Sequence, residues 1–493
     1  MSARPPRHQA AVPEGEHADM ALRIAQLSSE VVPFSKTGGL ADVLGALPPA
    51  LAALGHRVCV VTPAHRVSLR DPVPGERTGE VSALGIRAAV YRSAHRGADV
   101  LLLDAPQLYV RPALYALPDG DFPDNAVRFA FFARAALAAV AAWGGADVIH
   151  AHDWQAALAP LLLRTDDEVR RGLRRASSVL TVHNLAYQGV FPPWVLGPCG
   201  LPAGLFTIDS LEFYGQVSFL KGGLVAADAI TTVSPTYARE IVTPEFGCRL
   251  EGVLSARSAV LSGIVNGLDL EIWDPARDAA LPRTFEPATV AAGKAAAREA
   301  LGRELALEPL DAPLAGMVSR LAEQKGADVV AGVLDEIVAL GYNLVVLGTG
   351  ERRYEETMAA AERAHPGRIR VLLKFDERLA HLIYAASDVF LMPSRYEPCG
   401  LGQMIAMRYG TLPVVHRTGG LADTVTDAAQ PDGTGFVHDE LTPEALVAAL
   451  ARARRTIADP ARLAALRRRA MARDFSWDAS ARQYVELYRK LLA

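Results

Sequence analysis

Short apolar segments that are typical of β-strands alternate with segments of helical periodicity along almost the whole chain. Such an alternation predicts parallel strands joined by helices that cover both faces of a sheet. The strands are expected at 22–27, 57–62, 100–103, 147–150, 178–182, 229–233, 261–265, 314–318, 343–347, 368–373, 389–392 and 412–415. The longer helices are expected at 125–142, 216–227, 327–340, 351–363 and 477–492. We therefore predict an α/β protein built on doubly wound parallel sheets.

A break in this alternation divides the chain. Residues 274–287 are rich in Pro, Asp and Arg, and a polar-alanine helix is expected at 288–303. A chain of 493 residues is too long for a single hydrophobic core. We expect a first domain at 21–275, a second at 288–475, and a last helix at 476–493 that packs back on the first domain. Residues 1–20 are expected to form a disordered tail.

Charge and composition exclude several classes of partner. The formal net charge of −4 offers no basic excess for nucleic acid. No apolar run reaches the length of a bilayer span, and the first twenty residues lack the apolar core of a signal peptide. The 4 cysteines are scattered without paired spacing, which favours reduced thiols in a cytoplasm. We expect a cytoplasmic protein that binds neither nucleic acid nor a membrane.

A glycine-rich stretch, Lys36-Thr-Gly-Gly-Leu-Ala-Asp42, joins the first expected strand to the first expected helix. Backbone N–H groups of such a turn point outward, and the positive end of the helix favours an anion. Lys36 adds a mobile cation at the rim. Taken alone, the stretch also fits an ordinary strand–helix turn with a surface lysine. The motifs in the rest of the chain favour a phosphate site.

Two motifs in the second half also follow strands and open helices. Ser319-Arg-Leu-Ala-Glu-Gln-Lys325 supplies the Arg320 fork and the Lys325 point charge, which together suit a diphosphate without a metal. The alternative is a pair of solvated surface cations. Glu397-Pro-Cys-Gly-Leu-Gly402 exposes amides at a helix start, where Glu397 is placed to accept bonds from sugar hydroxyls. The alternative makes Glu397 a helix-start charge and Cys399 a buried filler.

Further polar clusters end other strands. His152-Asp153 and His183-Asn184 are expected at equivalent edges of one sheet, which favours a site over two structural histidines. No cysteine or acidic cluster completes a metal set with His150 and His152, so a metal is not expected. Asp119-Gly-Asp121 lies in a Pro/Gly-rich loop and is interpreted as a turn. Gly348-Thr-Gly350 is a weak phosphate signal, and Thr418-Gly-Gly fits a phosphate grip and a helix cap equally well.

Together these motifs resemble the bacterial glycogen synthase and plant starch synthase family over nearly the whole chain after residue 20. The resemblance rests on 36–42, Asp104-Ala-Pro, Leu108-Tyr109, Arg111-Pro112, 123–125, 150–154, 181–189, Asn266-Gly267, Arg320, Lys325, 397–401 and 417–423. It implies a GT-B fold, in which two Rossmann-like domains face a central cleft. It also implies an enzyme that transfers glucose from ADP-glucose to the non-reducing 4-hydroxyl of an α-1,4-glucan, with retention and without a metal or other cofactor.

The resemblance also implies residue roles. Lys36 and the Gly38 and Gly39 amides approach the diphosphate from the first domain, and Arg320 and Lys325 approach it from the second. Asp153 lies near the reacting carbon and the acceptor, and Tyr109 belongs to a stretch that touches glucan. Phe375 stacks on adenine. His183, Asn266, Glu397 and Asp42 surround the transferred glucose. The candidate catalytic residues are Glu397, His183, Asp153, Lys325 and Arg320, and the remaining donor-binding residues are Cys399, Gly400, Leu401, Gly402, Thr418, Gly419 and Gly420.

Two positions depart from the family pattern. Gly402 stands where the family usually has Thr, so a hydroxyl donor to phosphate is lost while the amide stays. Gln155 stands where His is common. Neither changes the assignment, but the first bears on donor affinity.

Other functions remain open at this stage. They are a UDP-glucose transferase or nucleotide-sugar epimerase of the same fold, a glucan-binding protein with a decayed site, and a phosphorylase with lysine-bound pyridoxal phosphate. Because the sequence supplies no unambiguous nucleophile, we favour same-face attack assisted by the leaving phosphate over double displacement. We also expect the two domains to close around the substrates.

Overall fold

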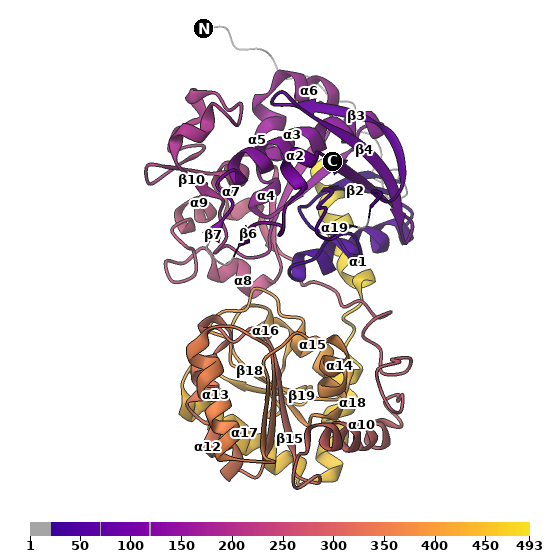
Figure 1. The fold of residues 1–493 in the computed structure, drawn as a ribbon, viewed down its shortest axis with the longest axis vertical. Coiled ribbons are helices and arrows are strands. Elements are labelled where there is room, and N and C mark those ends of the chain that lie inside the picture. Colours follow the sequence, from indigo (N-terminus) through magenta and orange to yellow (C-terminus); the bar gives the residue numbers. More distant parts are fainter. Residues whose placement is uncertain (1–20, 70, 118–119) are drawn as a thin grey trace.

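The computed structural model describes residues 21–69, 71–117 and 120–493, so the tail at 1–20 and Asp119 lie outside the described residues. The protein has two lobes, one above the other in Figure 1, and each is built on one large sheet. The first sheet has the order β14-β13-β9-β8-β1-β2-β5-β4-β3, and the second has the order β17-β16-β15-β18-β19-β20.

The strands of the first sheet are β1 (Arg23–Leu27), β2 (Arg57–Pro63), β3 (Glu76–Ala83), β4 (Ile86–His95), β5 (Ala98–Asp104), β8 (Val148–His152), β9 (Ser177–Val182), β13 (Ala229–Thr232) and β14 (Leu261–Gly263). All pairs from β14 to β5 are parallel, whereas β4 pairs antiparallel with β5 and β3. Short strands make two further sheets: β6 (Ala116–Leu117) with β7 (Gly120–Asp121), and β10 (Val190–Phe191), β11 (Glu212–Phe213) and β12 (Gln216–Ser218).

The helices of this part of the chain are α1 (Gly39–Ala53), α2 (Pro106–Tyr109), α3 (Asn125–Trp143), α4 (Asp153–Ala156), α5 (Leu158–Thr165), α6 (Asp167–Leu173), α7 (Phe219–Ala226), α8 (Pro235–Glu240) and α9 (Glu251–Ala256). Three 3-10 turns are η1 (Pro193–Leu196), η2 (Ala203–Leu205) and η3 (Ser258–Val260). The helix α3 has the length and apolar composition of a membrane span, but 72% of its most apolar window is buried inside the protein. It is therefore a core helix.

The second sheet is parallel throughout and contains β15 (Leu314–Val318), β16 (Asn343–Leu347), β17 (Ile369–Leu372), β18 (Val389–Met392), β19 (Leu412–His416) and β20 (Phe436–His438). Its helices are α10 (Val290–Leu305), η4 (Glu323–Lys325), α11 (Ala327–Ala331), α12 (Leu334–Ala339), α13 (Arg352–Ala364), α14 (Glu377–Ala386), α15 (Gly402–Arg408), α16 (Gly419–Thr424), α17 (Pro443–Ile457) and α18 (Pro460–Met471).

The central strands of the two sheets bury both of their faces, because successive side chains point to opposite sides and each side is covered. In β1, Ile24 belongs to the core on the α1 side, whereas Ala25 and Leu27 belong to the core that contains α3. In β15, Leu314 and Met317 likewise lie in two different cores. This is why these strands appear in the sequence as continuous apolar runs.

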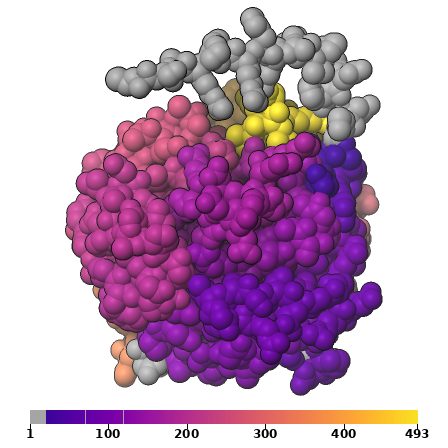
Figure 2. Space-filling view, turned by 90° about the horizontal axis from the view of Figure 1, so that it is seen from above, coloured from indigo at the N-terminus to yellow at the C-terminus, as the bar shows by residue number. Residues whose placement is uncertain are grey.

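The last helix, α19 (Trp477–Leu492), returns to the first lobe. Its residues Trp477, Ala481, Tyr484 and Tyr488 share a core with α1. Seen from above in Figure 2, the end of this helix reaches the surface of the first lobe. Where the chain crosses between lobes, the Leu268 amide donates to the Phe475 carbonyl, so the two crossings are tied to each other.

The structure differs from the expected elements in three places. The helix expected at 216–227 begins only at Phe219, because residues 216–218 pair with β10 and β11 and the Ser218 hydroxyl caps α7. The helix expected at 327–340 divides into α11 and α12 around Gly332. The hairpin of β3 and β4 was not predicted, because β3 is an exposed, polar edge strand without an apolar run.

Candidate active site

The predicted site residues follow strands at the centre of both sheets. In the first sheet β1 lies between β2 and β8, and in the second β15 lies between β16 and β18. A crevice forms where connections leave a central strand in opposite directions, outside the carboxyl ends of the strands. The segment 28–38 and Asp153 lie at the first crevice, and the segments 319–326 and 393–401 lie at the second.

Several contacts show that the two crevices face each other. The backbone amide of Asn266 donates a hydrogen bond to the buried thiol of Cys399, so these two residues of opposite lobes are in contact. Asp42 of α1 and Leu401 line one small pocket between the lobes, of about 60 Å³. The Thr236 amide and hydroxyl donate to Asp423, at 2.9 and 2.6 Å. The site is therefore shared between the lobes.

Lys36 lies at the rim of the first crevice. Its Nζ is 2.7 Å from Oδ1 of Asp42, and the two side chains are 50% and 34% exposed. Burial raises the pKa of Asp42 above its usual value, although Lys36 opposes the shift. A Cβ at Gly38 or Gly39 would meet none of the described atoms within 4 Å. These glycines therefore leave open space on the side where a Cβ would lie, which lets a ligand approach the backbone closely.

Glu30 organises this loop and was missed by the sequence analysis. Its buried carboxylate accepts bonds from the Thr37 amide, from the Thr37 hydroxyl at 2.6 Å and from the Gly38 amide at 3.4 Å. The Tyr115 hydroxyl also donates to it, at 2.6 Å. The sequence does place a carboxylate in the same strand–helix loop as the two glycines, and this could have indicated that Glu30 binds the loop amides.

His183 and Asp153 meet at the ends of β9 and β8. The His183 amide donates to Oδ1 of Asp153 at 2.7 Å, and Nε2 of the His183 ring lies 2.9 Å from Nδ1 of His152. Burial lowers the pKa of His183 to about 3, so its ring is neutral. Asp153 holds a left-handed backbone conformation, with φ of 54°, which is uncommon for a residue with a side chain.

The Asp153→Asn variant is expected to gain thermal stability relative to the wild type as the pH rises. Burial raises the pKa of Asp153 from 3.8 to about 7, against the lowering effect of the His183 and Asn184 amides. A raised pKa means that ionisation disfavours the folded state, so stability is lost from pH values just above 3.8 until about 7. Unfolding midpoints of both proteins on either side of this window measure the effect. A constant difference across the window would contradict it.

An ion pair between a buried carboxylate and a half-buried lysine lies at the second crevice. Nζ of Lys325 is 2.6 Å from Oε2 of Glu397, and the two side chains are 20% and 6% exposed. The Ser394 hydroxyl donates to the same carboxylate oxygen at 3.0 Å. Oε1 of Glu397 takes part in no hydrogen bond within the described ranges and is not enclosed. This oxygen is therefore free to accept a bond from a ligand.

Asn266 and Cys399 close the bottom of the site. The side-chain oxygen of Asn266 is enclosed and accepts no bond from the described part of the chain, which is costly unless a ligand or water supplies a donor. Burial raises the pKa of Cys399 to about 12, so its thiol is an inert filler. The alternative that the sequence analysis left open, Cys399 as a buried filler, thus describes its side chain.

Gly402, where the family usually has Thr, is closely surrounded. A Cβ at this position would lie 3.1 Å from the Phe390 ring and 3.2 Å from the Met392 sulfur. A threonine would require these neighbours to move. The other departure, Gln155, is buried, and its side-chain oxygen is enclosed without a partner in the described ranges.

The Thr418-Gly-Gly motif serves the contact between the lobes. Glu240 of α8 accepts bonds from the Thr418 hydroxyl at 3.1 Å and the Gly419 amide at 2.9 Å. The Gly420 amide donates to the Glu397 carbonyl at 2.9 Å. A Cβ at Gly419 would lie 2.0 Å from that carbonyl oxygen, so only glycine fits. In this structure protein groups, rather than open space, face these amides.

Arg320 and Phe375 extend from the second lobe. Arg320 is exposed and donates to the Gln324 side chain at 3.2 Å. Phe375 is 89% exposed, an unusual position for an aromatic ring unless it has a partner. Both side chains are therefore accessible to a ligand.

Tyr109 requires a correction. It was predicted to touch glucan, but its side chain is fully buried. Its hydroxyl donates to the Arg128 carbonyl at 3.3 Å, and its ring packs against His65 and Phe131. The prediction failed because α2 presents this aromatic side chain to the core, a direction that the motif alone does not indicate.

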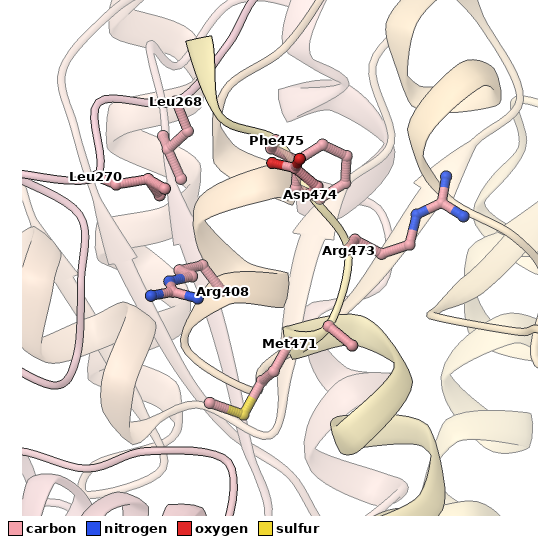
Figure 3. A pocket seen from close by; sticks show the side chains of 8 residues that line it. Leu268, Leu270, Arg408, Met471, Arg473, Asp474 and Phe475 are labelled. Atoms are coloured by element: carbon pink, nitrogen blue, oxygen red, sulfur yellow. The ribbon is translucent and has the colours of Figure 1, made fainter. Parts of the chain in front are cut away.

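Metal ligands and cavities do not alter this picture. The described part of the chain has no group of three or more His, Cys, Asp or Glu side chains arranged for a metal. Gly120–Asp121 forms β7, and Asp119 lies outside the described residues. A cavity of about 320 Å³ at the crossing between lobes is lined by Leu268, Arg408 and Phe475, among others (Figure 3). It contains none of the predicted site residues.

Two facing α/β lobes, with cations and carboxylates from both at the ends of the central strands, define a GT-B glycosyltransferase. Residues 23–256 match the model of the starch synthase catalytic domain, and residues 303–470 match that of glycosyl transferases group 1. The glycogen synthase of Anaeromyxobacter dehalogenans strain 2CP-C is 50% identical over 95% of this chain and 100% of its own. That of Geotalea daltonii is 46% identical over 96% and 99%. The chain belongs to the glycogen synthase family.

Solved structures agree with this assignment. The catalytic domain of starch synthase IV from Arabidopsis thaliana, bound to ADP and acarbose, superposes with a TM-score of 0.87 at 33% identity, covering 96% of this chain and 100% of that one. Sucrose-phosphate synthase from Thermosynechococcus elongatus, with a TM-score of 0.59 at 20% identity over 95% and 99% of the two chains, shares the fold. The expected GT-B fold and family are confirmed.

Proposed function

We propose that this enzyme transfers glucose from ADP-glucose to the non-reducing 4-hydroxyl of an α-1,4-glucan, with retention, and releases ADP. The observation that carries the proposal is the Lys325–Glu397 pair at 2.6 Å, with Glu397 buried, at the crevice that faces Asn266 of the other lobe. The starch synthase IV neighbour was solved with ADP and acarbose, a nucleotide and a sugar analogue of this kind.

The diphosphate of the donor is held between the lobes by positive groups. Lys36 and the amides of Gly38 and Gly39 approach from the first lobe, and Arg320 and Lys325 approach from the second. In the structure Lys36 and Lys325 are paired with Asp42 and Glu397. A bound diphosphate competes with these carboxylates for the two lysines. The lysines then stabilise the negative charge that develops on the diphosphate in the transition state, and they do so well because they are already held in place. Phe375 offers its exposed ring to adenine.

The transferred sugar lies among hydrogen-bond acceptors. Oε1 of Glu397 and the side-chain oxygen of Asn266 lack partners within the described residues. They accept bonds from sugar hydroxyls and place negative charge near the anomeric carbon, which becomes positive as its bond to phosphate breaks. Among the described residues at this carbon we assign no nucleophile, so the acceptor hydroxyl attacks from the face that the diphosphate leaves. Asp153 lies beside His183 and is assigned to the acceptor side.

The lobes close around both substrates, which removes water from the site.

The free thiols of all four cysteines fit our assignment of the enzyme to the cytoplasm.

The decisive experiment compares donors. Purified protein is incubated with glycogen and either radiolabelled ADP-glucose or UDP-glucose, and label in precipitated glycogen is measured. We expect transfer from ADP-glucose with at least about tenfold higher kcat/KM, since a differential interaction of 1.4 kcal/mol already gives that ratio. Preference for UDP-glucose would reassign the donor. Label in neither case, with intact binding of glycogen, would indicate a glucan-binding protein instead.

EDTA is expected to leave the transfer rate unchanged. Lys36, Arg320 and Lys325 supply the positive charge that a divalent metal supplies in other transferases, so the diphosphate needs no metal. Initial rates before and after dialysis against EDTA, with readdition of Mg²⁺ as the control, measure the effect. A loss of activity that Mg²⁺ restores would contradict the cation assignment.

A further inference from the structure

A chain of hydrogen-bonded, buried side chains runs from the last helix to the active site. It links His183 Nε2 to His152 Nδ1 at 2.9 Å, His152 Nε2 to Gln26 Oε1 at 2.5 Å, and Gln26 Nε2 to the Tyr488 hydroxyl at 3.2 Å. Beyond Tyr488 it continues to His150 Nδ1 at 2.7 Å, and from His150 Nε2 to Thr181 at 2.5 Å. Neither Gln26 nor Tyr488 belongs to any motif that the sequence analysis identified.

The arrangement follows from the sheet and the helix that covers it. Gln26 of β1 lies opposite His150 of the neighbouring β8, and His152 lies opposite Thr181 of β9. These polar side chains point to one face of the sheet, where α19 supplies Tyr488. Gln26, His150, His152 and Tyr488 are all 0% exposed. A buried polar network in a low dielectric is stable only when its members satisfy one another.

The donor and acceptor pattern fixes where each proton lies. Oε1 of Gln26 can only accept, so Nε2 of His152 carries its hydrogen. Burial lowers the pKa of His152 well below its usual value, with smaller effects from His150 and His183, and the ring is therefore neutral. Its Nδ1 must then accept, so Nε2 of His183 donates the bond between the two rings.

This leaves Nδ1 of His183 with a lone pair. In the described ranges this atom has no hydrogen-bond partner, and it is not enclosed. The neighbours of His183 are His152 from β8, whose ring lies beside its own, and Asp153 from α4, which accepts from its amide. Tyr484 and Tyr488 from α19 pack against His150, further along the network. None of them is a fixed cation that would disfavour a bond to this lone pair.

We propose that Gln26, His152 and Tyr488 are positioning residues that hold His183 as a neutral ring, protonated on Nε2, so that Nδ1 accepts a hydrogen bond from a hydroxyl of the transferred sugar. The role of this bond in transfer rests on the proposed function, but the protonation pattern does not. Gln26 suits the task because its amide does not titrate. The opposite pattern would place a hydrogen on Nδ1 and turn His183 from an acceptor into a donor.

The first test reads the ring directly, without substrate. In ¹⁵N-histidine-labelled protein, the two ring nitrogens of His183, assigned with a His183→Asn variant, are expected to show a protonated Nε2 and an unprotonated Nδ1. Gln26→Leu is expected to give a mixture of the two forms. Tyr342→Phe, which removes one buried hydroxyl bond to the Leu450 carbonyl in the other lobe, is the matched control and should leave the pattern unchanged.

The second test separates positioning from structural support by kinetics. Gln26→Leu and Tyr488→Phe are expected to lower kcat, by about tenfold for Gln26→Leu because one hydrogen bond is misdirected, with KM for ADP-glucose within about twofold. Tyr488→Phe keeps the ring that packs in the core, so this variant provides the kinetic test if Gln26→Leu folds poorly. Tyr342→Phe should lower only the unfolding midpoint.

Gln26→Glu provides the conservative rescue. Its carboxylate still accepts from His152, so kcat near pH 8 should return to within about threefold of wild type. The added negative charge raises the pKa of His152, and a protonated His152 donates from both nitrogens and forces Nε2 of His183 to accept. The acid limb of the kcat profile should therefore move up by about one pH unit or more. Unchanged ring signals in Gln26→Leu, or an unshifted acid limb in Gln26→Glu, would overturn the proposal.

Discussion

Replacing Lys325 by alanine is expected to lower kcat by about a thousandfold. Lys325 is the least exposed of the three cations assigned to the diphosphate, and a charge in a site that excludes water acts more strongly than one at the surface. In the proposed mechanism, the negative charge that develops on the departing ADP is then left to Arg320, Lys36 and the amides of Gly38 and Gly39. Initial rates of glucose transfer to glycogen at saturating ADP-glucose measure the loss.

The variant must be shown to fold. Removing one partner of a buried pair leaves Glu397 unpaired, which costs stability by about 3–5 kcal/mol when the charge remains buried. A lower but cooperative thermal transition is therefore expected. Lys490→Ala, which removes an exposed lysine of α19, is the charge-matched control and should retain full activity. A Lys325→Ala protein with near-normal kcat would remove this lysine from the mechanism.

Replacing Glu397 by glutamine is expected to reduce transfer by at least about a hundredfold while ADP binding is retained. In the proposed mechanism the carboxylate faces the sugar, and its negative charge stabilises the positive anomeric carbon. The amide keeps the shape and a bond from Ser394 but loses that charge. Because Lys325 then has no internal counterion, the site becomes more attractive to a diphosphate, so ADP should bind at least as tightly.

Calorimetry with ADP and transfer assays with ADP-glucose separate the two effects. The control is Glu304→Gln, which loses a comparable pair with Arg378 at the surface, where the side chains are 39% and 52% exposed. Such exposed pairs contribute about 0–1 kcal/mol, so this variant should behave like the wild type. Loss of ADP binding in Glu397→Gln in proportion to its loss of kcat would show that the carboxylate holds the nucleotide site rather than the sugar.

The sequence predicted the central strands well because they are buried on both faces. The runs at β15 and β18 carry no polar side chain, and β1 is apolar except for Arg23 and the buried Gln26. The ends of these strands mark where Lys325, Glu397 and Lys36 follow in the chain. The pairing of Lys325 with Glu397 was not predictable from their separation in the chain. It depends on β15 and β18 being neighbours in the sheet, which the element order alone does not specify.

Contacts between the lobes could not be predicted from the sequence, for a related reason. Glu240 ends a short helix in one lobe and meets the amide of Gly419 in the other, so no local pattern connects them. The Thr418-Gly-Gly motif was therefore read as either a phosphate grip or a cap. Glu30 and Tyr109 show the remaining limit: a motif places a residue near a site, but the direction of its side chain is decided by the packing of its element.

The return of α19 to the first lobe has a consequence for dissecting the protein. Tyr484 and Tyr488 complete the core on the α1 side of the first lobe, and the lobe's own residues 21–275 do not cover that apolar face by themselves. A fragment that stops at the first crossing would present this apolar surface to water and should aggregate. The smallest autonomous piece is thus assembled from two stretches of the chain that are remote in the gene, and joining them through a short artificial loop would restore it.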